Sequence, residues 1–156
     1  MRPLLSSLLL LCAALAVTPA CGPRGAALTP AEVQAHGTHR FAAPPGRVFA
    51  ATVTALKLEG YEVALSRPEE GSIKTNRKVV RADAVGNQYA VTAVEIARQY
   101  EITVEADGAG GTKVTATPRV FVGEAEVSDQ AVWQLEGPAG ERTLWKRLFE
   151  EIDETL

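Results

Sequence analysis

The first 22 residues constrain the fold most, because they decide how much of the chain remains to fold. Arg2 precedes an apolar run from Leu4 to Val17, and small residues follow that run. A cationic start, a short apolar stretch and small residues before a cleavage site are typical of a secretory signal peptide. The run is too short to cross the roughly 30 Å hydrocarbon core of a bilayer as a helix. We therefore expect residues 1–20 to be a signal peptide that is removed on export.

The residues at the expected cleavage site resemble the lipobox of bacterial lipoproteins. Ala20, Cys21 and Gly22 fit this motif, whereas Thr18 stands where the family usually has leucine. The resemblance implies that Cys21 carries diacylglycerol and palmitate and becomes the acylated N-terminus. Each buried CH₂ group contributes about 0.8 kcal/mol, so two or three acyl chains would anchor the protein stably. Ordinary secretion, with cleavage after Ala20 and no lipid, is the alternative.

Composition bounds the domain that remains. The chain has 156 residues with 16 basic and 19 acidic side chains, and only Arg2 is lost with the signal. One domain is expected from this length. The charge balance is mild, whereas a nucleic-acid binder would usually be basic. Cys12 leaves with the signal and Cys21 is expected to be lipidated, so the mature domain has no disulfide and depends on its hydrophobic core.

Residues 21–37 are interpreted as the lipidated N-terminus and a flexible tether, because they are small, polar and interrupted by proline and glycine. His36 and His39 follow at its end. Two histidines three positions apart could bind metal on a helix. However, no Cys, Asp or Glu with ligand spacing accompanies them, and Gly37 and Thr38 lie between. We therefore predict no metal site, and interpret both histidines as linker residues.

Hydrophobic periodicity predicts the elements of a domain over residues 38–156. Arg98 is the one charged residue that interrupts the apolar face of the longest predicted strand. A turn is predicted over residues 83–91, and Gly60 is predicted to cap a helix in the left-handed conformation. The glycine-rich run 107–111 leads into an alternating strand, so it is interpreted as a hairpin loop and not as a phosphate-binding loop. The predicted elements are strands over 39–43, 61–65, 72–81, 94–104 and 113–122, and helices over 47–59 and 138–156.

This order, β-α-β-β-β-β-α, predicts an α+β fold with an antiparallel sheet of four to five strands and two helices packed on one face. The chain also resembles the opening of BamC-like domains, which occur in bacterial lipoproteins. The resemblance covers about 35 residues and implies the same fold for residues 38–156. BamC is a lipoprotein of the machinery that assembles outer-membrane β-barrels, and it has two such domains. This chain has one, so a role in β-barrel assembly does not follow from the resemblance. The matching residues are Phe41, Pro44, Val48, Phe49, Ala51, Leu56, Gly60, Tyr61, Val63, Gly71, Ile73 and Thr75.

The sequence favours a binding role over catalysis. The domain has no cysteine and both histidines lie at its N-terminal margin, so we predict no enzyme activity, no catalytic residues and no cofactor. We predict a non-catalytic protein-binding or envelope-assembly accessory module, whose partners are the membrane, through the lipid anchor, and another envelope protein. The alternative is a small-ligand-binding lipoprotein that uses the groove between helix and sheet. A large apolar cavity there would favour the ligand binder, and a filled core would favour the protein-binding module.

Two features bear on location. Gly22 stands where an aspartate would favour retention in the inner membrane. By resemblance to enterobacterial sorting, we therefore expect the protein at the periplasmic face of the outer membrane.

The second feature is a concentration of positive charge on a predicted strand. Period-two spacing divides it between two faces of a strand, which suits a solvated edge that resists pairing. The sharper hypothesis is contact with an anionic lipid surface. The four cationic residues are Lys74, Arg77, Lys78 and Arg81.

Overall fold

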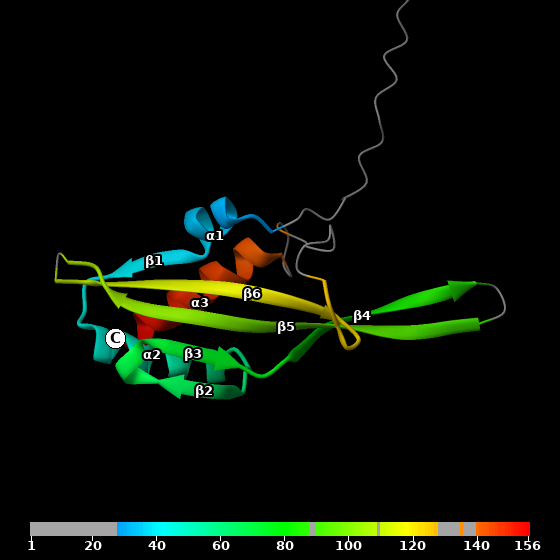
Figure 1. Cartoon of the computed structure of the whole chain (residues 1–156), viewed down its shortest axis with the longest axis horizontal. Helices are drawn as coiled ribbons and strands as arrows, with labels where there is room; N and C mark the ends of the chain where they lie inside the picture. Colours follow the sequence, from blue (N-terminus) through cyan, green and yellow to red (C-terminus); the bar gives the residue numbers. More distant parts are fainter. Residues whose placement is uncertain (1–27, 88–89, 109, 128–134, 136–139) are drawn as a thin grey trace, which may run out of the picture.

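The computed structural model describes residues 28–87, 90–108, 110–127, 135 and 140–156. This part of the chain forms an α+β fold, in which an open antiparallel sheet of seven strands is accompanied by three helices (Figure 1). The predicted fold class is therefore confirmed. The elements in chain order are α1 (Pro30–His36), β1 (Thr38–Phe41), α2 (Pro45–Leu58), β2 (Val63–Arg67), the 3₁₀ turn η1 (Pro68–Glu70), β3 (Ser72–Thr75), β4 (Lys78–Asn87), β5 (Ala90–Ala106), β6 (Thr112–Val122), β7 (Ala125–Glu126) and α3 (Glu141–Thr155).

The strands are ordered β2-β3-β5-β6-β1, and all pairs are antiparallel. β4 pairs with the part of β5 that lies beyond β3, and the short β7 pairs with the end of β6. The sheet has more strands than the four to five expected for two reasons. The segment predicted as one strand over 72–81 is broken at Asn76 and Arg77 into β3 and β4, and β7 lies in a stretch that had no predicted element.

α2 and α3 pack on one face of the sheet and enclose the main core (Figure 1). The predicted cap of the first helix is confirmed. Gly60 has a φ of 76°, its N–H donates to Lys57 O, and the Tyr61 N–H donates to Leu56 O at 2.8 Å. This pair of hydrogen bonds is the Schellman motif, which satisfies the last carbonyls of the helix and turns the chain into β2. A second, smaller buried cluster contains Ile96, Val120 and Val127.

The N-terminal side of the domain differs from the prediction. Residues 21–37 were expected to form a flexible tether, but Pro30–His36 form α1, and the side chain of Val33 is buried in the main core. Thr29 caps this helix, because its hydroxyl oxygen accepts a hydrogen bond from the Glu32 N–H at 3.2 Å. The folded domain therefore includes the helix before residue 38. Residues 21–27 lie outside the described residues.

The chain reverses its direction within residues 83–91 as predicted, but most of this range belongs to strands. β4 continues to Asn87 and β5 resumes at Ala90, with these two residues in register. β6 leaves β5 at Ile96, so the outer parts of β4 and β5 have only each other as strand partners within the described chain. Figure 1 shows them extending past the helices as a two-stranded arm. The arm, residues 81–87 with 90–95, forms because strand pairing continues beyond the core that the helices cover.

Candidate functional site

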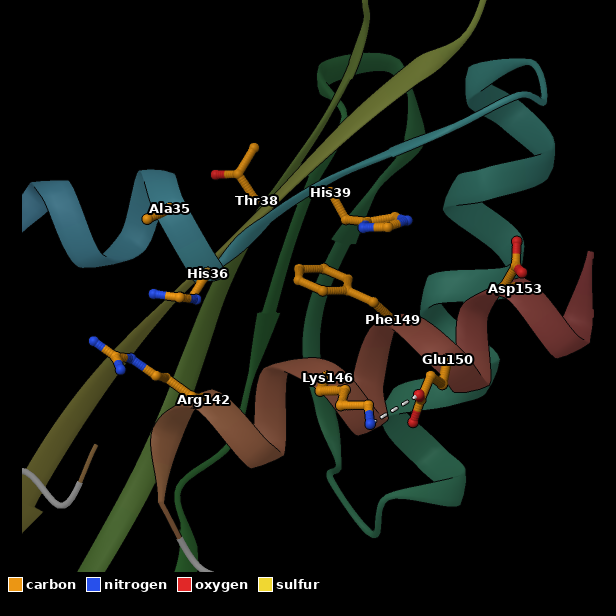
Figure 2. Close-up of a pocket in the computed structure, with 9 residues that line it drawn as sticks. All are labelled: Ala35, His36, Thr38, His39, Arg142, Lys146, Phe149, Glu150 and Asp153. Carbon is orange, nitrogen blue, oxygen red and sulfur yellow. Dashed lines mark ion pairs between the residues drawn. The ribbon is translucent and has the colours of Figure 1, made fainter. Parts of the chain in front are cut away.

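An open groove of about 370 Å³ lies between α1 and β1 on one side and α3 on the other (Figure 2). Ala35, His36, Thr38 and His39 line it from α1 and β1. The other wall comes from one face of α3. These residues recur every three or four positions, as expected for one side of a helix. They are Arg142, Lys146, Phe149, Glu150 and Asp153.

One end of the groove is fixed by Glu32, which joins α1 to α3. The guanidinium of Arg142 donates from Nη2 to Glu32 Oε1 at 2.8 Å and from Nε to Oε2 at 3.2 Å. This hydrogen bonding with Arg142 lowers the pKa of Glu32 below the ordinary glutamate value, so the carboxylate is ionised at neutral pH. His36 Nε2 lies 3.8 Å from Glu32 Oε2. A bidentate arginine and a histidine therefore meet at this end.

The middle of the groove is aromatic. The imidazole of His39 stacks on the ring of Phe149, with ring centroids 5.3 Å apart and an angle of 23° between the planes. Phe41 contacts the same imidazole edge-on at 4.8 Å. Figure 2 shows His39 and Phe149 side by side, between the basic end and the acidic side chains. Phe41 and Phe149 are buried in the main core, so the exposed imidazole of His39 is the ring surface that this part of the groove offers.

The other end of the groove carries acidic side chains. Glu150 pairs with Lys146 at 3.6 Å along α3, and Asp153 lies one turn further on. Both members of the pair are exposed, so the pair contributes about 0.3–0.5 kcal/mol and can be exchanged for a ligand group. The two ends of the groove therefore differ: Arg142 is already paired with Glu32 at one end, whereas the acidic side chains at the Asp153 end suit a cation.

The structure brings His36 and His39 together in this groove, where the sequence suggested linker residues. His36 ends α1 and His39 lies in β1. Within the described residues, no group of three His, Cys, Asp or Glu side chains is arranged to hold a metal ion.

The groove was not predicted from the sequence, because the prediction placed a flexible tether where α1 lies. The Thr29-Pro-Ala-Glu32 sequence could have signalled this helix, because Ser/Thr three residues before Glu is a capping-box pattern.

Each of the four cationic residues singled out in the sequence is paired with a different residue of the domain. In addition, Arg77 lies over the ring of Phe121, with its Cζ 3.8 Å from the ring centroid. Contact of these residues with an anionic surface stays a prediction, and any such contact would compete with the ion pairs and hydrogen bond already present. Each has its own partner: Lys74 contacts Glu101, Arg77 contacts Glu124, Lys78 donates to the carbonyl of Glu59, and Arg81 contacts Asp83.

A second charged cluster is sealed inside the domain. Arg98 Nε lies 2.8 Å from Glu141 Oε2, and both side chains are almost fully buried. These two atoms do not meet the geometry of a hydrogen bond, so the contact between Arg98 and Glu141 is an ion pair. Tyr100 donates its hydroxyl to Glu141 Oε1 at 2.5 Å. Burial raises the pKa of Glu141, and the charge of Arg98 opposes that rise. The cluster joins the start of α3 to β5.

The interface between the helices and the sheet is filled by side chains. Trp145 is fully buried, and its indole N–H donates to Ala116 O at 3.0 Å. Its ring also limits the space at Gly37, where an added Cβ would lie 2.8 Å from the indole. Leu56, Ile73, Ile102 and Ile152 fill the rest of this layer. In the part of the chain that the structure describes, large buried side chains therefore pack this layer.

Comparisons with known proteins give little to add to this geometry. No family model matches the chain. No curated protein matches it either. Among solved structures, the crystal structure of Ara h 8.0201 is similar over 76% of this chain and 97% of that chain, with 14% sequence identity and a TM-score of 0.31. A likeness at that TM-score carries no information about function. In the described part of the chain, no helix has the length and apolar character needed to span a membrane.

Proposed function

We propose that this protein is a lipid-anchored, non-catalytic binding module of the bacterial envelope that holds another envelope protein. The observation that carries this proposal is the filled helix–sheet interface, which leaves the surface of the domain for recognition. The BamC-like opening of the sequence is consistent with an accessory module of this type. By the resemblance at residues 20–22, we place the protein at the periplasmic face of the outer membrane.

The groove between α1, β1 and α3 is the surface that we assign to the partner. Its lining suits a polypeptide segment that carries a basic side chain toward Asp153 and an aromatic or apolar group against the exposed imidazole of His39. The lipid anchor would keep this surface close to the membrane. Six residues lie between Cys21 and Leu28, so the seven steps from one Cα atom to the other can span at most about 25 Å.

A small-ligand binder is the second candidate. The groove volume of about 370 Å³ falls within the range of known ligand sites, which is roughly 300–1,000 Å³. A cationic molecule with an aromatic or apolar group would match the same residues. The two candidates differ in the size of what is bound, so one experiment can separate them.

Site-specific photo-cross-linking tests the partner assignment. A photoreactive residue at position 146, inside the groove, is expected to cross-link the full chain to a discrete envelope protein in cells. The control position is Lys57, an exposed lysine on α2 that does not line this groove. The same discrete product at both positions, or at neither, would contradict the assignment. Native mass spectrometry of the purified protein would show a bound small molecule if the second candidate holds.

The lipid anchor gives a separate prediction. Cys21→Ser is expected to abolish incorporation of radioactive palmitate, because the thiol is the only group at that position that can carry the acyl-modified glyceride. The wild-type chain should be labelled and should fractionate with membranes. An unlabelled wild-type chain would show that the lipobox resemblance is misleading, and the protein would then be secreted without an anchor.

A further inference from the structure

The arm formed by β4 and β5 has an open edge. β4 pairs with β5 along its length, and no strand of the described chain lies against its other side. An isolated two-stranded hairpin is at best marginally stable in water, and an exposed strand edge is a template for pairing with another chain. Neither proline nor lysine occurs between Arg81 and Asn87, so two of the devices that protect an edge are absent from that stretch.

The charges on β4 are self-complementary. Arg81 and Asp83 lie on the same face of the strand, with Nε and Oδ1 2.8 Å apart, and both side chains are about half exposed. Two β4 strands related by a two-fold axis run antiparallel, and the axis passes between one residue and its own copy. If that residue is Ala82, Arg81 of each copy lies directly opposite Asp83 of the other. The four charges then alternate in sign.

The neighbouring symmetric registers are disfavoured by the same charges. An axis at Arg81 places two guanidinium groups opposite each other, and an axis at Asp83 does so with two carboxylates. Directly opposed like charges destabilise a strand pair, whereas opposite charges stabilise it. Ala82 and Ala84 are exposed, and small side chains allow two edges to approach. Of these three symmetric registers, the charges of the edge therefore favour the one centred on Ala82.

From this geometry we infer that β4 is a homotypic interface, in which the arms of two copies pair antiparallel about Ala82 and form a continuous four-stranded ribbon. The contact spans about five residues, because a β-bulge between Val79 and Arg81 ends the regular ladder. Its small area makes the pairing weak for free molecules. This inference rests on the proposed lipid anchor in one respect: the anchor would confine both copies to one membrane, which raises their effective concentration and favours the pairing. This interface is separate from the groove between α1, β1 and α3.

Disulfide trapping in the full chain tests the register. In the inferred pair the two Ala82 Cα atoms lie about 4.5–5.5 Å apart, within the range that a disulfide can bridge. Ala82→Cys is therefore expected to give a cross-linked dimer under mild oxidation of membranes. Ala84→Cys is the matched control, since it has the same side chain and exposure on the same strand. Its two copies would lie roughly 13 Å apart, so it should give several-fold less dimer.

Charge reversal in the Ala82→Cys chain tests the complementarity. Arg81→Asp alone and Asp83→Arg alone should each lower the dimer yield several-fold, because each places like charges opposite each other. When these two single variants are co-expressed, mixed dimers should return to the parental yield, because every opposed pair is again complementary. The double variant Arg81→Asp, Asp83→Arg should also return to it. Equal cross-linking at positions 82 and 84, or reversals without effect, would overturn the inference.

Discussion

Replacing Arg98 with methionine is expected to lower the free energy of unfolding by about 3–5 kcal/mol, because it leaves the carboxylate of Glu141 buried without its counter-charge. Arg98 and Glu141 are almost completely excluded from solvent, and their charged atoms lie 2.8 Å apart. The Tyr100 hydroxyl donates one hydrogen bond to the carboxylate but supplies no net charge. Urea denaturation followed by circular dichroism measures the loss.

The double variant Arg98→Met, Glu141→Leu should recover most of that stability. Removing both members of a buried ion pair is often neutral or favourable, because neither charge then has to be desolvated. Arg119→Met is the matched control. Arg119 lies on the open face of β6 and pairs with Glu101 and Glu126, which are partly exposed, so its loss should cost no more than about 1 kcal/mol. Equal losses for Arg98→Met and Arg119→Met would contradict this account.

The pH dependence of the same variant gives a further check. Burial raises the pKa of Glu141 above the ordinary glutamate value, so between these two pKa values the folded state binds more protons than the unfolded state. The contribution of Glu141 to stability therefore falls as the pH rises through that window. Removing Arg98 removes the charge that opposes this rise. The Arg98→Met loss should accordingly be smaller in acidic buffer, where a proton neutralises Glu141, than at neutral pH.

This pair illustrates what the sequence could and could not predict. Arg98 is visible as the one charge in an apolar strand face, because period-two alternation is a local property. Its partner is not visible, since Glu141 stands at the start of a helix among other charged residues. Acidic residues are common in the first turn of a helix, where they complement the dipole. Only the packing of α3 across β5 shows that this particular carboxylate is buried.

The same distinction separates the elements that were predicted from those that were missed. The cap at Gly60 depends on a few consecutive residues, and it was predicted correctly. The arm was missed because Gly86 and Asn87 are typical turn residues, and the local pattern does not show that strand pairing continues through them. The groove depends on α1 meeting α3, which lie near opposite ends of the chain, so no local pattern could place Arg142 beside His36.

Gly71→Ala is the second substitution with a large expected effect, at about 2–5 kcal/mol. Gly71 has a φ of 62°, in the left-handed region that costs roughly 1–2 kcal/mol for residues with a Cβ. The second cause of the expected loss is a steric clash. A Cβ at this position would lie 2.1 Å from the carbonyl oxygen of Val104, so the backbone of β3 or β5 would have to move. Overpacking of this kind costs a further 1–3 kcal/mol or so.

Gly108→Ala separates the two causes. Gly108 has a φ of 69°, and a Cβ there would meet nothing within 4 Å, so this variant carries the backbone strain without the clash. The difference between the two variants in urea midpoint therefore measures the clash. Hydrogen exchange locates it, because the Val104 N–H donates to Gly71 O at 2.8 Å and should lose protection only in Gly71→Ala. If both variants lose the same stability and Val104 remains protected, β3 does not approach β5 as closely at this turn as the structure shows.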